Sequence, residues 1–371
     1  MSAPRARLLA YYLPQFYPIE ENDRWWGKGF TEWTSVAEAR PLFRGHRQPR
    51  IPADLGFYDL RLAETRAAQA EMATAHGIEG FCYWHYWFGG KRLLDRPFAE
   101  VLGSGEPDFP FCLAWANQAW TDTWLGSGRV LQEQPYSPED DVAHARWLTE
   151  AFGDRRYVTV GGRPLFLVYK PLDLPEPART ADTIRAEAVR AGLAEPLVLG
   201  IDAHAFGHDF RADGLDGTVQ FEPSLGLLPR AGAVSARERL ARTVDRAARN
   251  ARLGVWHPAR NVHTYRSLVE LTEQRRAARS HPGYPGVFVG WDNTPRRGER
   301  AVVLLNERPD EFADRLARLV AGAADRDPQE RLIFVNAWNE WAEGNHLEPD
   351  LDTGLTKLEA VKAVVLPGPT G

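Results

Sequence analysis

The sequence predicts an α/β protein built as a single (β/α)8 TIM barrel, with long βα loops over the C-terminal face of the strands. Eight short apolar runs, each bounded by turn residues, recur along the chain. Stretches with helical spacing separate the runs, and a polar residue with chemical use follows each of them. The 371 residues can bury one large core, and we see no repeat, low-complexity tract or linker, so we expect one domain over residues 1–371.

The expected strands are rich in Val, Ile, Leu and Phe, and most of them lack alternation. Both features are typical of strands that are covered on both faces, so we expect parallel pairing. The expected strands span residues 7–13, 78–84, 109–116, 164–169, 197–201, 217–221, 287–291 and 332–337.

Helices are expected between the strands, where apolar residues return every three or four positions. The clearest of them span residues 59–76, 138–152, 180–191 and 309–321. Eight alternating strand and helix units predict a closed barrel.

Two connections are too long for minimal βα units. Residues 14–52 have little periodicity and are crowded with Trp, Gly and Phe, so we expect a binding loop folded over the barrel mouth. Residues 226–286 are rich in Arg and Ala, and we expect two helices there, followed by an exposed turn at 281–286.

Charge and composition argue against several classes of partner. A net charge of −5 without a basic block disfavours nucleic acid and anionic membranes. We find neither the roughly 20 apolar residues of a membrane span nor a signal peptide, so we expect a cytoplasmic protein. No Gly-rich phosphate loop follows the first strand, and we expect no cofactor. Cys82 and Cys112 lie inside apolar runs and are expected to be buried, reduced thiols.

Two acidic residues follow the last expected strand. Glu340 and Glu343 stand three apart in the segment 336–344, which also contains two Trp residues. Cleavage of a glycosidic bond requires one carboxyl group to protonate the leaving oxygen and a second to act at or near the anomeric carbon. If the chain turns after the strand, residues three apart face the same way. In a continuing strand they would face opposite sides.

Further candidate residues are polar or aromatic and lie after the strands or in the first long connection. Barrel active sites form at the carboxyl ends of strands, and Trp rings often form platforms for sugars, although Trp is also a common core residue. The candidate substrate-binding residues are Tyr11, Gln15, Trp26, Glu32, Trp33, His85, Trp87, Trp115, Asn117, Tyr169, Asp202, Trp291, Asn339 and Trp341.

Several of these candidates have a second interpretation. His85 could be a hydrogen-bonded structural residue, and Glu32 could form a plain salt bridge within its loop. Asp202, His204 and His85 could form a metal site, but no HxH pair follows the first strand and the spacing is irregular. We therefore expect no metal.

Four motifs carry a resemblance to a known family. They are the LPQF motif at residues 13–16 and the segments 25–33, 80–88 and 336–348. Together they resemble the WbsX-like family of bacterial polysaccharide-cluster proteins, which is similar to glycoside hydrolase family 99. Nearly the whole chain is covered. The resemblance implies a (β/α)8 barrel and retaining, endo-acting α-mannosidase chemistry.

The same resemblance implies a role for each acid. Glu340 would deprotonate the 2-hydroxyl of the sugar, which then displaces the leaving group to form a 1,2-anhydro intermediate. Glu343 would act first as the acid and then as the base. Glu343 must therefore hold a proton at neutral pH, while Glu340 stays ionised. The chain departs from the family pattern at Tyr17 and in the segment 115–124, so mannose is not assured as the sugar.

The function expected first is therefore a retaining glycoside hydrolase that acts on an α-linked bacterial polysaccharide or glycan. The second is a glycosyltransferase of polysaccharide or O-antigen biosynthesis, because family members are commonly labelled so. The third is a sugar-binding barrel without activity, which predicts loss of one of the paired acids. Both acids are present. In each case the partner is a carbohydrate.

Overall fold

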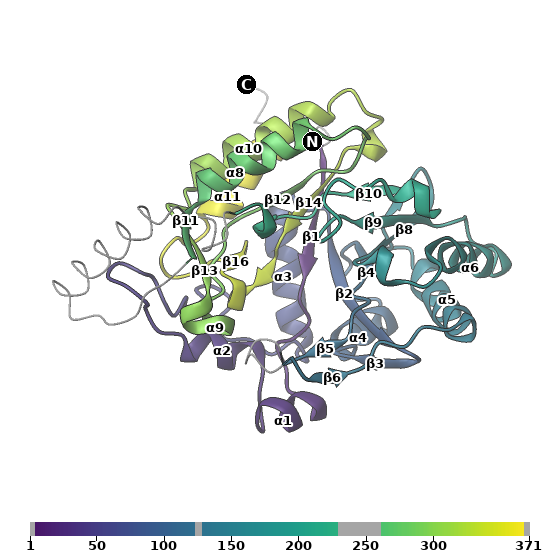
Figure 1. The fold of residues 1–371 in the computed structure, drawn as a ribbon, viewed down its shortest axis with the longest axis horizontal. Coiled ribbons are helices and arrows are strands. Elements are labelled where there is room, and N and C mark those ends of the chain that lie inside the picture. Colours follow the sequence, from purple (N-terminus) through teal and green to yellow (C-terminus); the bar gives the residue numbers. More distant parts are fainter. Residues whose placement is uncertain (1–3, 123–127, 229–260, 367–371) are drawn as a thin grey trace, which may run out of the picture.

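The computed structural model, which describes residues 4–122, 128–228 and 261–366, has eight parallel strands in a nearly closed barrel surrounded by helices (Figure 1). The predicted fold class is confirmed, and each expected strand overlaps one of the eight. Their order around the barrel is β10, β9, β8, β4, β2, β1, β14, β12. Their bounds are β1 Arg7–Tyr12, β2 Gly80–Phe88, β4 Phe111–Trp115, β8 Arg163–Val168, β9 Leu197–Ile201, β10 Gly217–Val219, β12 Gly286–Phe288 and β14 Leu332–Asn336.

The barrel closes between β10 and the residues that precede β12. Val219 and Tyr284 form a parallel bridge, and the Tyr284 amide donates to the Thr218 carbonyl at 2.9 Å. Gly286 allows this approach, because a Cβ at this position would lie 2.0 Å from the Gln220 carbonyl oxygen. The expectation of an exposed turn at 281–286 was therefore wrong, because only Pro282 among these residues is exposed and Tyr284 and Gly286 take part in the closure.

Helices cover the outside of the barrel, and the four predicted helices are confirmed with small shifts of their ends. Ser137 caps α5, where its hydroxyl accepts from the Asp140 amide at 3.1 Å, and Pro138 occupies the first turn. The bounds of the longer helices are α3 Ala63–Ala75, α4 Arg96–Ser104, α5 Pro138–Phe152, α6 Pro177–Arg190, α8 Tyr265–Ala277, α10 Pro309–Ala323 and α11 Thr356–Val365.

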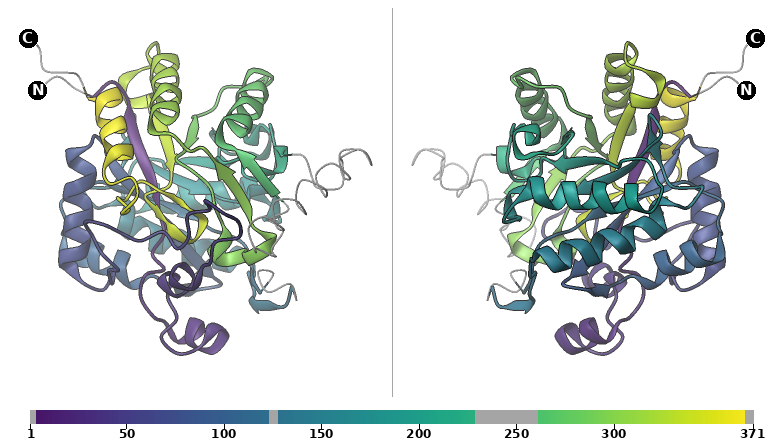
Figure 2. Two further views of the ribbon diagram at one scale, coloured as in Figure 1. Left: turned by 90° about the vertical axis from the view of Figure 1, so that its left-hand side faces the viewer. Right: turned by 90° about the vertical axis from the view of Figure 1, so that its right-hand side faces the viewer.

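The first long connection, which we expect to be a binding loop with little periodicity, contains two short helices, α1 Glu20–Trp26 and α2 Glu32–Glu38. In the second connection, the structure describes the strand β11 Asn261–Thr264 and the helix α8, while residues 229–260 lie outside the described part. The strands of the barrel point toward the end where α1, α2 and α9 (Thr294–Arg297) lie, and the two views of Figure 2 show α1 projecting there.

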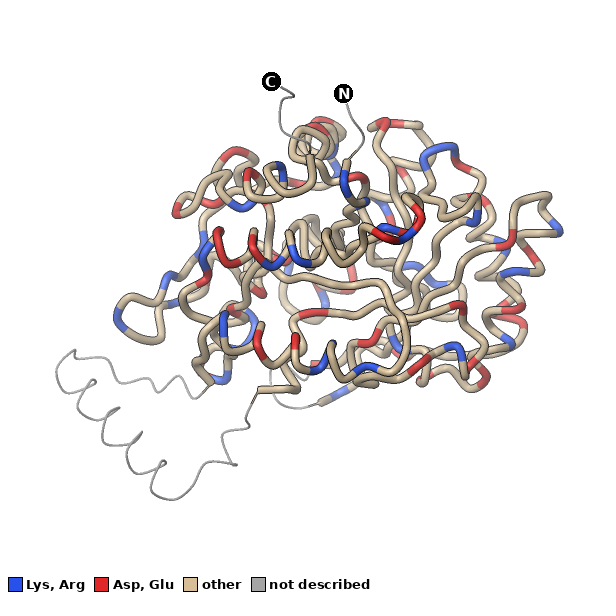
Figure 3. The backbone as a smooth tube through the Cα atoms, turned by 90° about the horizontal axis from the view of Figure 1, so that it is seen from above, with Lys and Arg blue, Asp and Glu red and all other residues tan. Residues whose placement is uncertain are grey.

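Short strands complete the structure, mostly near the same end. They are β3 Lys91–Leu93, β5 Trp120–Thr121, β6 Val130–Gln132, β7 Thr159–Val160, β11 with β13 Val302–Leu305, and β15 Asn339–Glu340 with β16 Asn345–His346. Basic and acidic residues are interleaved along the chain (Figure 3). Among the helices of the described part, none is long and apolar enough to cross a membrane. Cys82 and Cys112 are buried and free, as expected.

Candidate active site

Glu340 and Glu343 lie on one side of a turn that follows β14. Glu340 ends the short strand β15, and the 3-10 helix η6, Trp341–Glu343, begins directly after it. A 3-10 helix has three residues per turn, so side chains three apart eclipse one another. The chain thus turns after the strand, which is the arrangement that brings two carboxylates three apart together.

Gly344 fixes this turn against the neighbouring β12 segment. It adopts the left-handed conformation with φ 60°, and a Cβ there would lie 2.9 Å from the Asp292 backbone nitrogen. The same nitrogen donates to the Glu343 carbonyl at 2.7 Å. A residue larger than Gly would push the turn away from β12, so Gly344 positions the backbone that carries Glu343.

One guanidinium joins both carboxylates. Arg296 of α9 donates from Nη1 to Oε1 of Glu343 at 2.7 Å and from Nη2 to Oε2 of Glu340 at 3.1 Å. It also donates from Nε and Nη2 to Oε1 of Glu32, at 3.0 and 2.5 Å. The side chain of Arg296 is 17% exposed, and those of Glu340 and Glu343 are 10% and 15% exposed. Three carboxylates therefore share one partly accessible cation.

Burial raises the pKa of Glu340 to about 8, against the opposing effect of Arg296. Burial also raises the pKa of Glu343, and Arg296 again opposes the shift. We expected Glu340 to be the ionised member, yet its pKa is raised as well. When Glu32, Glu340 and Glu343 are all ionised, their three negative charges exceed the single positive charge of Arg296. This excess favours the uptake of a proton by Glu340 or Glu343.

Partly exposed aromatic rings lie beside the carboxylates. Tyr86, at the end of β2, packs edge-on against Trp120 with ring centroids 5.0 Å apart, and Trp120 meets Trp25 of α1 at 5.7 Å. Tyr169, after β8, packs against Trp84 at 5.2 Å. Burial raises the pKa of the Tyr86 and Tyr169 hydroxyls, and the nearby charge of Glu340 raises both further. Both hydroxyls thus stay neutral hydrogen-bonding groups near the acids.

The sequence did not single out Arg296, Tyr86, Trp120 or Trp25 as site residues. Arg296 stands in a run of charged residues, TPRRGER, which is typical of a solvated surface turn. The one available signal was its position shortly after an expected strand. Trp120 and Trp25 stand beside polar residues in the sequence, as the predicted candidate Trp33 does.

Three predicted residues are buried in the core beside the turn that carries the acids. Trp33 is buried and donates from its indole to the Tyr58 carbonyl at 2.8 Å. Trp341 is also buried, and its ring meets that of Trp33 at 5.4 Å. Asn339 is fully buried, and its side chain bonds both the amide and the carbonyl of Leu13, at 2.7 and 3.0 Å. In this structure the three side chains support the site from within the core.

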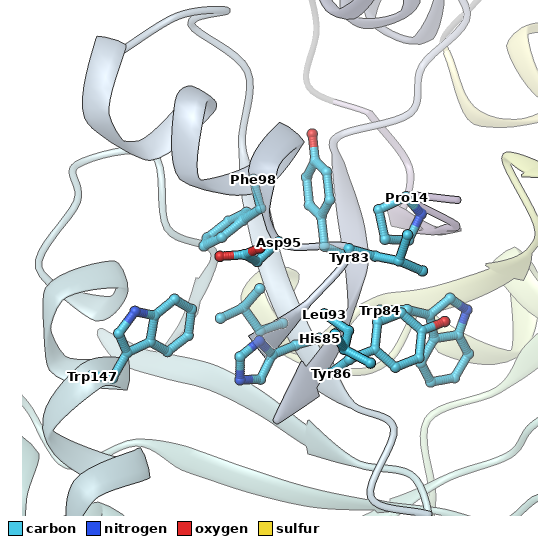
Figure 4. A pocket seen from close by; sticks show the side chains of 11 residues that line it. Pro14, Tyr83, Trp84, His85, Tyr86, Leu93, Asp95, Phe98 and Trp147 are labelled. Atoms are coloured by element: carbon cyan, nitrogen blue, oxygen red, sulfur yellow. The ribbon is translucent and has the colours of Figure 1, made fainter. Parts of the chain in front are cut away.

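Three others face the outer helices. His85 stacks on Trp147 of α5 at 4.6 Å and lies 3.0 Å from His144, between the Nε2 atoms. Figure 4 shows His85 on the Trp147 side of β2. The cavity that these residues line has a volume of about 10 Å³, which holds no more than a water molecule. Trp87 bonds Asp140 of α5 at 2.9 Å, and the buried Trp115 packs on His144. These positions match the structural interpretation of His85.

The remaining candidates are dispersed. Asp202 is fully buried and forms ion pairs with Arg275, at 2.5 Å, and with Arg279. Two arginines therefore balance the charge of this carboxylate. Within the part of the chain that the structure describes, no cluster of three or more His, Cys, Asp or Glu side chains could hold a metal ion.

Asn117 joins the ends of β4 and β8, where its side chain bonds the Lys170 backbone twice at 2.8 Å. Tyr11 is buried inside the barrel, stacked on Trp84. Trp291 is buried in a second apolar cluster. Gln15 and Trp26 are half-buried in the first long connection, where the Gln15 carbonyl accepts from the Glu32 amide at 3.0 Å.

A larger groove lies elsewhere, between α3 and α4 on the outside of the barrel. Its volume is about 730 Å³, and it is lined by Ala63, Glu64, Arg66, Ala67, Glu100, Gly103, Ser104, Glu106 and Pro107. None of the candidate residues lines this groove, so it does not belong to the site.

Comparison with known families identifies the family to which the chain belongs. A family model described as "Glycosyltransferase WbsX" matches residues 8–361, so the chain belongs to the WbsX family, as the motifs indicated. Two relatives, each named "Uncharacterized protein WxcX", come from two strains of Xanthomonas campestris pv. campestris. They are 41% identical over 369 residues, which make up 98% of this chain and 50% of each relative. The chain therefore spans about half the length of these relatives.

Solved structures show the same fold. The GH99 endo-alpha-mannosidase from Bacteroides thetaiotaomicron, in complex with bis-tris-propane, matches with a TM-score of 0.56 and 15% identity over 98% of this chain and 97% of that one. A structure described as a glycoside hydrolase-like protein matches with a TM-score of 0.58 and 12% identity, over 99% of this chain and 95% of that one. The barrel of this chain is thus of the kind found in GH99.

Proposed function

We propose that this member of the WbsX family is a retaining glycoside hydrolase that cleaves an α-linked bacterial polysaccharide or glycan. The observation that carries the proposal is the convergence of Glu340 and Glu343 on Arg296, beside the partly exposed rings of Tyr86 and Tyr169. Glycoside cleavage requires two carboxyl groups, and flanking aromatic rings offer apolar surface on which a sugar can stack. The GH99-like barrel supports the same proposal.

The proposed reaction uses the pair with one proton between its members. Glu340 takes the proton of the sugar 2-hydroxyl while that oxygen attacks the anomeric carbon. The bond to the leaving oxygen breaks, and Glu343 gives this oxygen its proton. A water molecule then opens the 1,2-anhydro ring at the anomeric carbon, losing a proton to Glu343, while Glu340 returns its proton to the 2-oxygen. Arg296 stabilises whichever carboxyl group is ionised.

A second candidate function is glycosyl transfer, which the description of the family as a glycosyltransferase favours. The two functions differ in the donor that they need. A hydrolase releases new reducing ends from a glycan without an added nucleotide sugar. A transferase lengthens a glycan and depends strictly on the nucleotide sugar.

The test is a panel of rhamnose-, mannose- and other α-linked bacterial glycans, with products read by mass spectrometry. We expect cleavage without a nucleotide sugar, and a loss of about 100- to 10,000-fold in kcat in Glu340→Gln and in Glu343→Gln. Glu150→Gln, at an exposed position of α5, is the matched control. Retained glycan binding with no cleavage by any variant or by wild type would instead support a sugar-binding barrel.

A further inference from the structure

We propose that Arg296 is a positioning residue that holds Glu340 and Glu343 at a fixed spacing and sets the charge balance between them, with Glu32 as its anchor. The inference deepens the proposed function and rests on it. It connects three segments that are far apart in the sequence: Glu32 lies 264 residues before Arg296, and Glu343 lies 47 residues after it.

The geometry of the guanidinium carries the first step. Nη1 bonds Glu343 and Nη2 bonds Glu340, so a different terminal nitrogen holds each carboxylate. These nitrogens belong to one planar, rigid group. The spacing of the two acids is therefore tied to the width of that group, which the flexible chain and single nitrogen of a lysine could not reproduce.

The contacts also leave the acids able to react. Arg296 uses Oε1 of Glu343 and Oε2 of Glu340. The second oxygen of each carboxylate takes no part in these bonds, and both side chains keep some exposure. A sugar can therefore meet one oxygen of each acid while the guanidinium keeps the other in place.

Glu32 fixes the guanidinium from the opposite side. Its Oε1 accepts from both Nε and Nη2 of Arg296, and its side chain is only 3% exposed. Glu32 begins α2, whose first turn is held by a capping box between Thr31 and Thr34. The helices α2 and α9 and the turn η6 also pack against one another pairwise. The anchor is therefore part of the folded framework rather than a free surface ion pair.

The charges act in opposite directions on the acids. Arg296 lowers the pKa of Glu340 and of Glu343, and Glu32 raises both. Arg297 of α9 lowers the pKa of Glu343 further. The other facing groups are the hydroxyls of Tyr86 and Tyr169, whose pKa values are raised, so they stay neutral. Neutralising Arg296 or Glu32 should therefore shift the pH profile in opposite directions.

The experiment compares kcat, KM and the pH profile of three variants on the α-linked glycan that wild type cleaves in the panel. We expect Arg296→Lys to keep the profile but lose about 100-fold in kcat, because the charge remains and the fork is lost. We expect Arg296→Gln to move the profile up by about one to three pH units. Glu32→Gln should move it down. Arg308→Lys, at an exposed ion pair with Asp310, is the control.

Wild-type kcat and pH profiles in the Arg296 variants would overturn the inference. A purely structural role would lower the melting temperature without opposite shifts from Arg296→Gln and Glu32→Gln, and this result would overturn it too. If Arg296→Gln does not fold, the opposite shift in Glu32→Gln and the kcat loss in Arg296→Lys still decide.

A second measurement needs no substrate. Protein labelled with ¹³C at the Glu carboxyl carbons can be titrated by NMR, with the two signals assigned from Glu340→Gln and Glu343→Gln. We expect the midpoints of both signals to rise in Arg296→Gln, while unchanged midpoints would overturn the inference. If wild type cleaves no glycan in the panel, the proposed function fails, and this titration still judges the role of Arg296.

Discussion

The indole of Trp341 donates a hydrogen bond to Oε2 of Glu348 at 2.6 Å, and both residues are buried. Trp341 stands between the two candidate catalytic acids in the sequence. The same carboxylate accepts from the Tyr58 hydroxyl at 2.8 Å and from Gln69 of α3 at 2.6 Å. Glu348 thus ties the turn that carries the acids to the helix α3 and to the loop before it.

Replacing Glu348 by Gln should weaken both stability and turnover. An amide has one acceptor oxygen, and its NH2 group would face a donor from Gln69, Tyr58 or Trp341. We expect the free energy of unfolding to fall by about 1–3 kcal/mol, as for a buried group left unsatisfied, and kcat to fall because the turn is no longer held. Urea unfolding and glycan cleavage measure the two effects. Equal values in Glu348→Gln and wild type would contradict this role.

Glu340 should make the stability of the protein depend on pH. Its pKa is raised to about 8 by burial, while an unfolded Glu titrates near 4.3. The folded chain therefore binds this proton more tightly, so the stabilisation is complete at acidic pH and is lost as the pH rises toward 8.

We expect the free energy of unfolding of wild type to fall relative to that of Glu340→Gln between about pH 5 and 8, by up to about 1.4 kcal/mol per pH unit. Denaturant unfolding across this range measures the difference. Two parallel curves would show that Glu340 titrates normally in the folded protein.

Trp120 and Trp147 should differ in what they contribute. Trp120 is partly exposed and packs against Tyr86 beside the acids, whereas Trp147 stacks on His85 outside the barrel. We expect Trp120→Ala to raise KM for the cleaved glycan by about 10- to 100-fold, equivalent to the burial of one large side chain. Trp147→Ala should lower the melting temperature and leave KM unchanged. The opposite result would show that the sugar binds on the side of β2 that faces α5.

Gly286 should be essential for closure of the barrel. Ala at this position would bring a Cβ against the Gln220 carbonyl, and backbone rather than a flexible side chain would have to move. We expect Gly286→Ala to destabilise the fold by at least about 1–3 kcal/mol, the usual cost of overpacking. Gly322 of α10 has no atom within 4 Å of such a Cβ, so Gly322→Ala should be neutral or stabilising, by up to about 1 kcal/mol. Thermal unfolding of the two variants compares them directly.

Patterns among neighbouring residues were enough to predict the strands, the pairing of the two acids and the family. The run at 197–201 is apolar throughout and forms β9 over the same residues. A strand that is covered on both faces is a continuous apolar run, so it can be identified from its own residues alone. The pairing of Glu340 with Glu343 is also local, since three positions span one 3-10 turn. The family motifs were likewise readable from neighbouring residues.

Only the tertiary structure decided which side chains meet. Arg296 reaches Glu32 across 264 residues, and no periodicity encodes that contact. Trp33 and Trp341 look like sugar platforms in sequence but pack on each other in the core. Side chains alternate along a strand, and in β2 Tyr86 lies near the acids while His85 stacks on Trp147 of α5. The physical reason is that spacing along the chain fixes the shape of one element at a time, whereas the surroundings of a side chain depend on elements that are brought together only by folding.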